Sequence, residues 1–393
     1  MRFEGEAYSY DRAFKYCPSP QDREWLRTTA NLPALAKVKV LDPTAGGGSV
    51  PLEANRLGLH ASANDLNPVA ALLQRATIEW PSRFGSELST EFEILAGKFV
   101  QMREDRLRDY YPAEPEPNAF PTNYLWARTI LCPYCEGLVP LSPNWRLGPD
   151  GTGIRLIPSK EKEAAKRYCE FEIVRKVGDQ SAGTMADGDA TCPFQDCGRV
   201  IDGDEVKRQA QAQQMGEQLF AVAFKRRIAG KTKTGKPKAK WKRGYRSPRR
   251  EDDISAKLAA YISEKMPEWE AMNLVPTEPI DELSNYDRGH RMYGMHRWID
   301  MFSPRQLLAH CTSMEVFSEL LTKAGEQKTL NEATKATFVY LAIALDKLRD
   351  YNSRATRWIV QREVMANTFD SHNFAIKWSY AEMPLLVGNA GYD

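Results

Sequence analysis

Residues 40–68, with the sequence VLDPTAGGGSVPLEANRLGLHASANDLNP, constrain the fold more than any other segment of this chain. An aliphatic run ends at Asp42, and three consecutive glycines occupy positions 46–48. Apolar residues at helical spacing follow over 49–57, and a second short run is closed by Asp65. The pattern therefore predicts a strand, a glycine turn, a helix and a second strand, with an acid at the end of each strand.

The glycine turn and its acids indicate a ligand that contains adenosine. Glycine permits close approach of the backbone to a ligand, and an acid about 20 residues further on can accept the hydroxyls of a ribose. A GxGxxG turn would hold a pyrophosphate, but here the glycines are consecutive and Asp42 would repel that group. The same carboxylate suits the ammonium of a methionine moiety, and no P-loop lysine follows Gly48.

S-adenosylmethionine is therefore the cofactor that the sequence predicts, and a tight turn without a ligand is the alternative. Because the carboxyl ends of parallel strands share one edge of a sheet, the binding residues are expected to gather at that edge. They are Asp42, Pro43, Thr44, Ala45, Gly46, Gly47, Gly48, Asp65 and Asn67.

Four of the seven cysteines form two pairs, each beginning with Cys-Pro. Cys132 and Cys135 have two residues between them, a spacing that lets both thiolates turn around one tetrahedral ion, as in zinc ribbons. Cys192 and Cys197 have four residues between them, which predicts a looser knuckle. We predict one Zn²⁺ held by these four thiolates; an iron–sulfur cluster and four metal-free buried thiols are the alternatives. The odd number of cysteines argues against a disulfide framework.

A strongly basic segment lies between residues 225 and 250, with 13 Lys or Arg and no acid. Small and turn residues interrupt it, which predicts an irregular basic loop. Aromatic residues within it add a stacking surface to the phosphate-neutralising charges, and DNA is the predicted partner; a solvated loop that keeps the chain soluble is the alternative. The expected DNA contacts in the segment are Lys231, Lys233, Lys238, Lys240, Trp241, Arg243 and Tyr245.

One further DNA contact is expected outside the basic segment, at Arg305. Ser303 and Pro304 predict the start of a helix, with serine as N-cap and proline at the first position. Arg305 then lies in the first turn, where it faces a phosphate or a base. The alternative, equally supported, is that Arg305 stabilises the start of the helix and contacts between domains.

Composition and charge exclude few classes of protein. Lys and Arg total 54 against 52 acids, so the net charge of +2 says little about partners. No apolar run is long enough for a transmembrane span, and MRFEGEAYSYDR at the N-terminus has no apolar signal region. We therefore expect no membrane contact and a cytoplasmic location.

Several motifs occur along the chain in an order that resembles that of a known family. They are DPTAGGGSVPLEA (42–54), NDLNP (64–68), CPYC (132–135), TCPFQDCG (191–198), GEQLFAV (216–222), YGMHRWIDMFSPRQLLAH (293–310), ALDKLRDYNSRATRW (344–358), NTF (367–369) and KWSYAEMPL (377–385). In this order they resemble the zinc-ribbon-containing, adenine-specific DNA methylases, which are partly described as a domain of unknown function. The resemblance spans nearly the whole chain.

The chain departs from that family in two ways. The family carries an Asp-Pro-Pro-Tyr tetrapeptide that engages the target amine, and this chain has none. Its closest strings, at 142–145 and 42–45, lack the second proline, and residues 1–37 do not match the family's leader. We therefore expect the chain to correspond to the front and middle of a longer methylase.

The resemblance implies an α/β fold with a Rossmann-like methyltransferase core, an inserted β-rich zinc ribbon and a helical C-terminal half. The expected divisions are an S-adenosylmethionine-binding α/β region (1–120), the zinc-ribbon insert (121–205), a basic loop region (206–252) and a mainly helical region completing the core (253–393). Within the last region, one buried helical stripe is expected from the spacing of Phe338, Leu341, Leu345 and Leu348.

The implied reaction is transfer of a methyl group from S-adenosylmethionine to the exocyclic amine of adenine in DNA. The catalytic residues stay unassigned because the tetrapeptide is absent. One alternative is a non-catalytic DNA-binding or specificity component of a methylation or phage-defence system. Another is a split enzyme, in which a second polypeptide carries the tetrapeptide.

Overall fold

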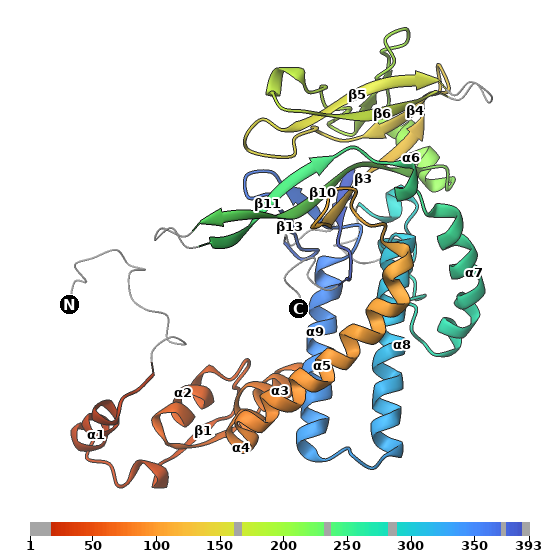
Figure 1. Cartoon of the computed structure of the whole chain (residues 1–393). Helices are drawn as coiled ribbons and strands as arrows, with labels where there is room; N and C mark the ends of the chain where they lie inside the picture. Colours follow the sequence, from red (N-terminus) through yellow and green to blue (C-terminus); the bar gives the residue numbers. More distant parts are fainter. Residues whose placement is uncertain (1–16, 161–166, 232–236, 282–288, 371–374, 387–393) are drawn as a thin grey trace. The chain divides into compact units, whose positions relative to one another are not determined.

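The computed structural model describes residues 17–160, 167–231, 237–281, 289–370 and 375–386 (Figure 1). The chain is a mixed α/β structure that divides into two compact units. The first unit comprises residues 1–97 and 323–343, and the second comprises 98–322 and 344–393.

The first unit contains short helices around one pair of strands. Its elements are α1 (Pro20–Thr29), the 3₁₀ turn η2 (Leu35–Lys37), β1 (Lys39–Asp42), α2 (Ser49–Leu57), β2 (His60–Ala63), α3 (Pro68–Gln74), the π-helix η3 (Arg75–Glu79), α4 (Trp80–Phe84) and parts of the long helices α5 (Ser86–Leu107), α8 (Pro304–Glu326) and α9 (Glu332–Tyr351).

Strands β1 and β2 pair in parallel, with α2 as the crossover between them. Asp42 lies opposite Ala63 in the register, so both strands end at the same edge. Gly48 is the N-cap of α2 and lies in the left-handed region, at φ +85°, where a side chain would be strained. The predicted order of strand, glycine turn, helix and strand is confirmed. In the described part of the chain the parallel sheet has these two strands, so a complete Rossmann-like core remains a prediction.

Helix packing gives the first unit its core. Ala76, Trp80 and Leu88 pack with Ala336 of α9, and all four are buried. The Tyr340 ring lies edge-on to Trp80, with 6.0 Å between the ring centroids. This core lies between α9 and the helices that follow β2. Strands β1 and β2 are outside it, and their residues are exposed or half-buried.

The second unit is built on an antiparallel sheet. Its strands follow the order β11 (Pro237–Arg246), β10 (Gly216–Lys231), β3 (Ala119–Leu131) and β14 (Ser379–Glu382), and β4 (Leu138–Leu141) also pairs with β3. The smaller sheets are β5 (Gly153–Lys160) with β6 (Arg167–Val174), β7 (Met185–Ala186) with β8 (Asp189–Thr191) and β9 (Val200–Ile201), and β12 (Arg357–Ile359) with β13 (Val364–Ala366). Its other elements are helices α6 (Gly203–Gln211) and α7 (Ser255–Ala271), the remaining parts of α5, α8 and α9, and the turns η4 (Arg108–Tyr110), η5 (Val177–Asp179), η6 (Arg250–Asp252), η7 (Arg291–Tyr293) and η8 (Trp298–Met301).

Strand β3 is buried on both faces, and the alternation of its side chains gives each face a different partner. Leu125 and Ala127 belong to the apolar core that includes Phe171 of the β5–β6 hairpin. Tyr124 lies on the other face and contacts Arg305 of α8, 3.9 Å from the guanidinium carbon to the ring centroid. Figure 1 shows the β5–β6 hairpin and α8 on opposite sides of this sheet.

The basic segment expected as an irregular loop is instead a β-hairpin, so that prediction is wrong. Strand β10 pairs with β3 from Gly216 to Arg226 and continues to Lys231, and β11 pairs with it over the whole of Pro237–Arg246. The apolar run from Leu219 to Phe224 fixes β10 in the sheet core. The basic residues that follow this run are therefore extended because they continue the same strand, although their composition alone did not indicate a strand.

The start of α8 is as predicted, but Arg305 is not available to DNA. Ser303 and Gln306 form a reciprocal cap, in which each side chain bonds the other's backbone N–H. Arg305 is only 2% exposed, and its Nε donates to Glu382, which is itself buried on β14. Ser303 Oγ donates to the second oxygen of Glu382 at 3.0 Å. The alternative role, stabilising the helix start and joining elements of the core, is the one observed.

The helical stripe expected near the C-terminus is confirmed. Its four predicted members, Phe338, Leu341, Leu345 and Leu348, are all buried on α9.

Removing one partner of the Arg305–Glu382 pair should destabilise the second unit strongly. Arg305→Met leaves a buried carboxylate without its cation, and we expect a loss of about 3–5 kcal/mol in the free energy of unfolding. Replacing both residues, in Arg305→Met with Glu382→Leu, should recover most of that loss because no charge is then buried. Urea unfolding, followed by circular dichroism, measures the free energy of unfolding of both variants.

Arg106→Met, which breaks the more exposed pair with Glu319, is the control and should cost at most about 1 kcal/mol. Equal effects of Arg305→Met and Arg106→Met would contradict this role for the buried pair.

Candidate cofactor pocket and metal centre

The glycine turn is held by contacts from residues that follow β2. Asp65 accepts the backbone N–H of Gly46 at 2.7 Å through one oxygen and that of Asn67 at 2.8 Å through the other. Gln74 Nε2 donates to the Gly46 carbonyl at 2.9 Å. The N–H donors of Asn67 and Gly46 lower the pKa of the Asp65 carboxyl, so it is ionised at neutral pH.

The three glycines differ in what surrounds them. A Cβ at Gly46 or Gly47 would meet no atom within 4 Å, so this part of the turn faces open space. A Cβ at Gly48 would lie 2.9 Å from Ile78 Cδ1 and 3.0 Å from Gln74 Cγ. Gly48 is therefore required for packing against the helix after β2, and Gly46 and Gly47 leave the backbone open to a ligand.

The remaining predicted cofactor residues have unequal roles. Asp42 ends β1, and one of its oxygens accepts the Thr44 N–H at 3.3 Å. Asn67 is the N-cap of α3, and its side chain accepts the N–H of Val69 at 2.9 Å. Pro43 and Thr44 are exposed, and Ala45 is buried. Gln74 was not predicted, because nothing in the sequence connects it with a turn 28 residues earlier.

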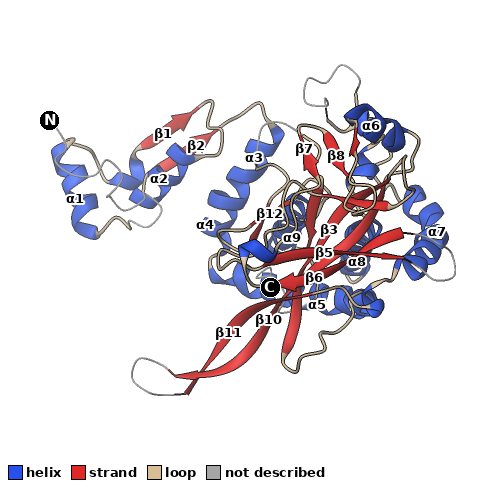
Figure 2. Cartoon of the chain, turned by 90° about the horizontal axis from the view of Figure 1, so that it is seen from above, coloured by secondary structure: helices blue, strands red, loops and turns tan. Residues whose placement is uncertain are grey.

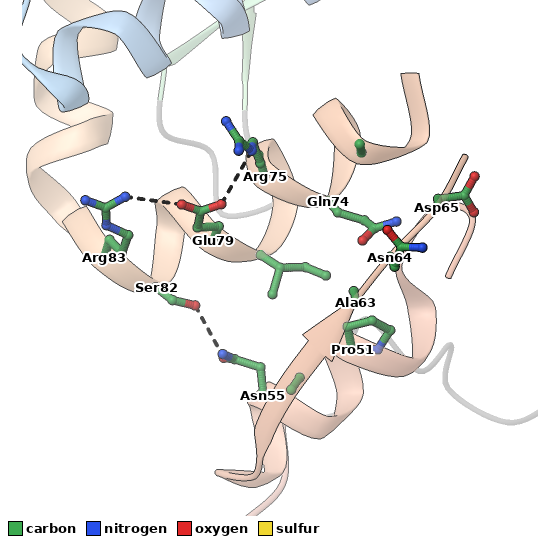
Figure 3. A pocket seen from close by; sticks show the side chains of 13 residues that line it. Pro51, Asn55, Ala63, Asn64, Asp65, Gln74, Arg75, Glu79, Ser82 and Arg83 are labelled. Atoms are coloured by element: carbon green, nitrogen blue, oxygen red, sulfur yellow. Dashed lines mark hydrogen bonds and ion pairs between the residues drawn. The ribbon is translucent and has the colours of Figure 1, made fainter. Parts of the chain in front are cut away.

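A pocket of about 500 Å³ lies beside Asp65 (Figure 3). Its lining includes Asn64, Asp65 and Gln74 near the glycine turn, and the helical residues Arg75 and Glu79. The lining belongs to α2, to β2 and the turn that follows it, and to the helices from α3 to α4. Its size is in the range of small-molecule sites, and one wall is a π-helix, a distortion that is frequent at functional sites. Of the residues predicted to bind the cofactor, Asp65 lines this pocket.

Charged side chains form the far wall of the pocket. Glu79 lies between two arginines, 3.7 Å from Arg75 and 3.2 Å from Arg83. Ser82 donates to Asn55 Oδ1 at 3.4 Å across the pocket. This wall can offer hydrogen bonds to a polar ligand.

The four paired cysteines come together as predicted. Their Sγ atoms all lie within 4.8 Å of one another, and the closest are Cys132 to Cys197 at 3.8 Å and Cys135 to Cys192 at 3.7 Å. Four thiolates about 2.3 Å from a tetrahedral zinc lie roughly 3.8 Å apart, whereas a disulfide requires about 2 Å. The cluster can therefore hold one metal ion, and its dimensions suit zinc.

Each cysteine pair lies in a loop that joins two antiparallel strands. The first loop joins β3 to β4, and the Cys132 N–H donates to Gly137 O at 2.8 Å. The second joins β8 to β9, and the Cys192 N–H donates to Arg199 O at 2.9 Å. The four residues inside the second pair are accommodated by turning the chain at Phe194, whose carbonyl accepts the Cys197 N–H.

Burial in the cysteine cluster disfavours uncompensated thiolates, so thiolate ligands there require positive charge nearby. Burial raises the pKa of Cys132 and of Cys192, and the Arg199 N–H lowers that of Cys197. Arg167 stacks on the Phe194 ring at 4.4 Å and Arg199 on the Tyr134 ring at 4.8 Å. A dication with four thiolates carries about two negative charges, which these guanidinium groups can offset.

The residues predicted to contact DNA fall into three groups. Lys240 is exposed, and Trp241 is 57% exposed with its ring edge-on to Phe120. Arg243 is half-buried beside Glu363 at 3.9 Å, and Tyr245 is buried and donates to the same carboxylate at 2.8 Å. The prediction is therefore wrong for Tyr245, which is part of the core, as it is for Arg305. Lys233 lies outside the described residues, and Lys231 and Lys238 are described only as strand backbone.

The string nearest to the absent tetrapeptide, at 142–145, is part of the core. Ser142 and Trp145 are each 1% exposed, and the Trp145 indole donates to Ala182 O at 3.1 Å. Neither side chain can reach a substrate in this structure.

Comparisons of the chain with protein-family models, with curated proteins and with solved structures found no match. Among the helices described, none combines the length and apolar character needed to cross a lipid bilayer.

We expect about one zinc per chain in protein purified without added metal, measured by elemental analysis. Cys132→Ser should lower that ratio and the melting temperature together, because a structural metal contributes directly to folding. Cys17→Ser is the matched control, since Cys17 is exposed and outside the cluster. Metal-free protein with unchanged thermal stability would contradict the assignment.

Proposed function

We propose that this chain binds S-adenosylmethionine and DNA as part of an adenine-specific DNA methyltransferase. The observation that carries the proposal is the arrangement of Asp42 and Asp65 around an open glycine turn at the carboxyl edge of a βαβ unit. Ligands of α/β proteins bind at that edge, and Asp65 also lines a pocket of suitable size.

The two acids suit different parts of the cofactor. A carboxylate offers about four acceptor sites, and the Asp65 carboxylate uses two of them for Gly46 and Asn67. Its remaining lone pairs can accept the two hydroxyls of a ribose. Asp42 is the candidate for the ammonium of the methionine moiety. When bound, S-adenosylmethionine supplies an electrophilic methyl group.

The cysteine cluster has a structural role in this proposal. We propose that it binds Zn²⁺ and fixes the two hairpin loops that carry the cysteines, in a zinc-ribbon-like module. This module adjoins the sheet that contains the basic hairpin β10–β11. Cys132 directly follows β3, which pairs with β10. Zinc would therefore fix one end of the strand that supports the basic residues.

A further segment that carries the tetrapeptide, in a longer form of the protein or on a second polypeptide, is the proposed source of the catalytic groups. The string at 142–145 is buried, and the chain has no Asp-Pro-Pro-Tyr. Leu41 is 71% exposed on β1 and Leu66 is 99% exposed beyond β2. Parallel sheets are normally covered on both faces, so these side chains support a partner that adds strands and helices there. A non-catalytic specificity component that keeps the cofactor pocket is the second candidate, favoured by the same absent motif.

Calorimetric titration with S-adenosylmethionine tests the cofactor site. Asp65→Ala should weaken binding at least tenfold, or about 1.4 kcal/mol, and Asp42→Ala should weaken it similarly. Gly47→Ala separates ligand contact from folding: its Cβ meets nothing within 4 Å, so stability should hold while affinity falls.

Asp202→Ala is the control for the cofactor titration. Asp202 also accepts a backbone N–H, that of Asp204 at 2.8 Å, but it lies in the other unit. Unchanged affinity in Asp42→Ala, Asp65→Ala and Gly47→Ala would remove the proposed cofactor site.

Transfer of a tritiated methyl group to unmodified DNA tests the catalytic half of the proposal. The purified chain should show weak or no turnover, because it lacks the Asp-Pro-Pro-Tyr element that orients the adenine amine in the resembled family. Addition of a polypeptide that carries the tetrapeptide should restore activity. Robust turnover by the 393-residue chain alone would contradict the need for a partner.

A further inference from the structure

The basic hairpin extends beyond the sheet that supports it (Figure 2). Strand β3 pairs with β10 as far as Arg226, opposite Ala119. The Arg227 N–H still donates to Asn118 O at 2.9 Å. From Ile228 onward β10 is paired with β11 alone, and the register continues to Lys231 opposite Pro237. The outer part of the hairpin is therefore a two-stranded ribbon.

Acidic residues neutralise the base of this ribbon. Arg246 pairs with Glu114 at 2.8 Å and with Asp252 at 2.5 Å, and Arg226 pairs with Glu116 at 2.6 Å. Arg249 also reaches Asp252, and Arg243 reaches Glu363. These arginines hold the hairpin to the rest of the unit and have little charge left for a partner.

Other basic residues of the hairpin make no such pairs. Lys225, Arg227, Lys240 and Lys242 form no ion pair with any acid in the described ranges. Arg227, Lys240 and Lys242 are exposed. The structure thus separates basic residues that stabilise the fold from basic residues that are free to bind.

The strand register puts the unpaired charges on both faces of the hairpin, around the point where the ribbon leaves β3. Side chains directly opposite one another share a face. Lys225 is opposite Arg243 and Arg227 is opposite Trp241, which defines one face. Lys242 is opposite Arg226 and Lys240 is opposite Ile228, which defines the other.

We propose that this ribbon enters the major groove of duplex DNA. A ribbon inserted into a groove lies between two phosphate backbones, so cations on both of its faces can reach phosphate while neighbouring side chains reach the base edges. A ribbon lying flat on a nucleic acid uses cations on one face. The major groove, about 12 Å wide, admits a two-stranded ribbon, whereas the minor groove is about half as wide. Trp241, beside Arg227, supplies an apolar surface for base edges and thymine methyl groups.

The inference rests on the proposed function for its choice of DNA, but the ribbon distinguishes duplex from other nucleic acids. A single strand needs a row of stacking aromatics along one face, and the exposed aromatic on the described ribbon is Trp241. The deep, narrow major groove of duplex RNA excludes such a ribbon.

Fluorescence anisotropy with duplex DNA, single-stranded DNA of the same sequence and duplex RNA tests the proposal. Lys225→Ala with Arg227→Ala removes charge from one face, and Lys240→Ala with Lys242→Ala from the other. Each pair should weaken duplex binding at least tenfold and lower the slope of log affinity against log salt by about 2. Arg250→Ala is the control, since this exposed arginine lies in η6 outside the ribbon, and it should change affinity less than twofold.

Protection of guanine N7 from dimethyl sulfate reports the major groove directly. We expect protection by the wild-type chain and its loss in Trp241→Ala with Arg227→Ala. Sensitivity to one face alone, single-strand or RNA binding equal to that of duplex DNA, or unprotected N7 at saturation would each overturn the proposal. Titrating S-adenosylmethionine into the same variants separates the two hypotheses: duplex binding through the ribbon without cofactor binding would reject the methyltransferase but keep the groove contact.

Discussion

Strand β3 is the element on which the second unit depends. It is paired along one edge with β10 and along the other with β14 and β4, and its central residues are buried on both faces. Cys132 directly follows the last residue of β3. The first residue of β3, Ala119, is opposite Arg226, near the point where the basic ribbon leaves the sheet. In the middle of the strand, Tyr124 is opposite Glu382. The metal cluster, the ribbon and the buried ion pair are thus all positioned by one strand.

The buried charges next to β3 show how the fold directs basic residues to different roles. Arg305 is enclosed by Tyr124 and Glu382, so its charge is satisfied inside the protein. Arg246 is likewise satisfied by Glu114 and Asp252 at the base of the ribbon. Positive charge is left for a partner on the basic residues of the hairpin that form no ion pair with a described acid, such as Arg227 and Lys240. The electrostatics of the unit are therefore set by the arrangement of acids, because the basic residues alone are evenly spread along the segment.

Local patterns in the sequence were sufficient to predict the βαβ unit, the cap at Ser303 and the cysteine cluster. Each of these depends on a few residues with a fixed spacing, and for the cysteines the ligand geometry itself limits the possible arrangements. The sequence could not predict that Tyr245 is buried, because its partner Glu363 lies 118 residues away. It also failed for the basic hairpin, since the extended conformation there is imposed by pairing with β3. The contact of Gln74 with the glycine turn was missed for the same reason: it depends on how the chain returns after β2.

Photo-crosslinking with tritiated S-adenosylmethionine tests the central claim, that the turn between β1 and α2 and the acid after β2 form a cofactor site. Ultraviolet irradiation of the intact chain followed by peptide mapping would locate the label without any substitution. Our account predicts label in the peptides that span residues 42–83, removed by competition with excess S-adenosylhomocysteine. Label confined to the second unit, or no competable label at all, would contradict it.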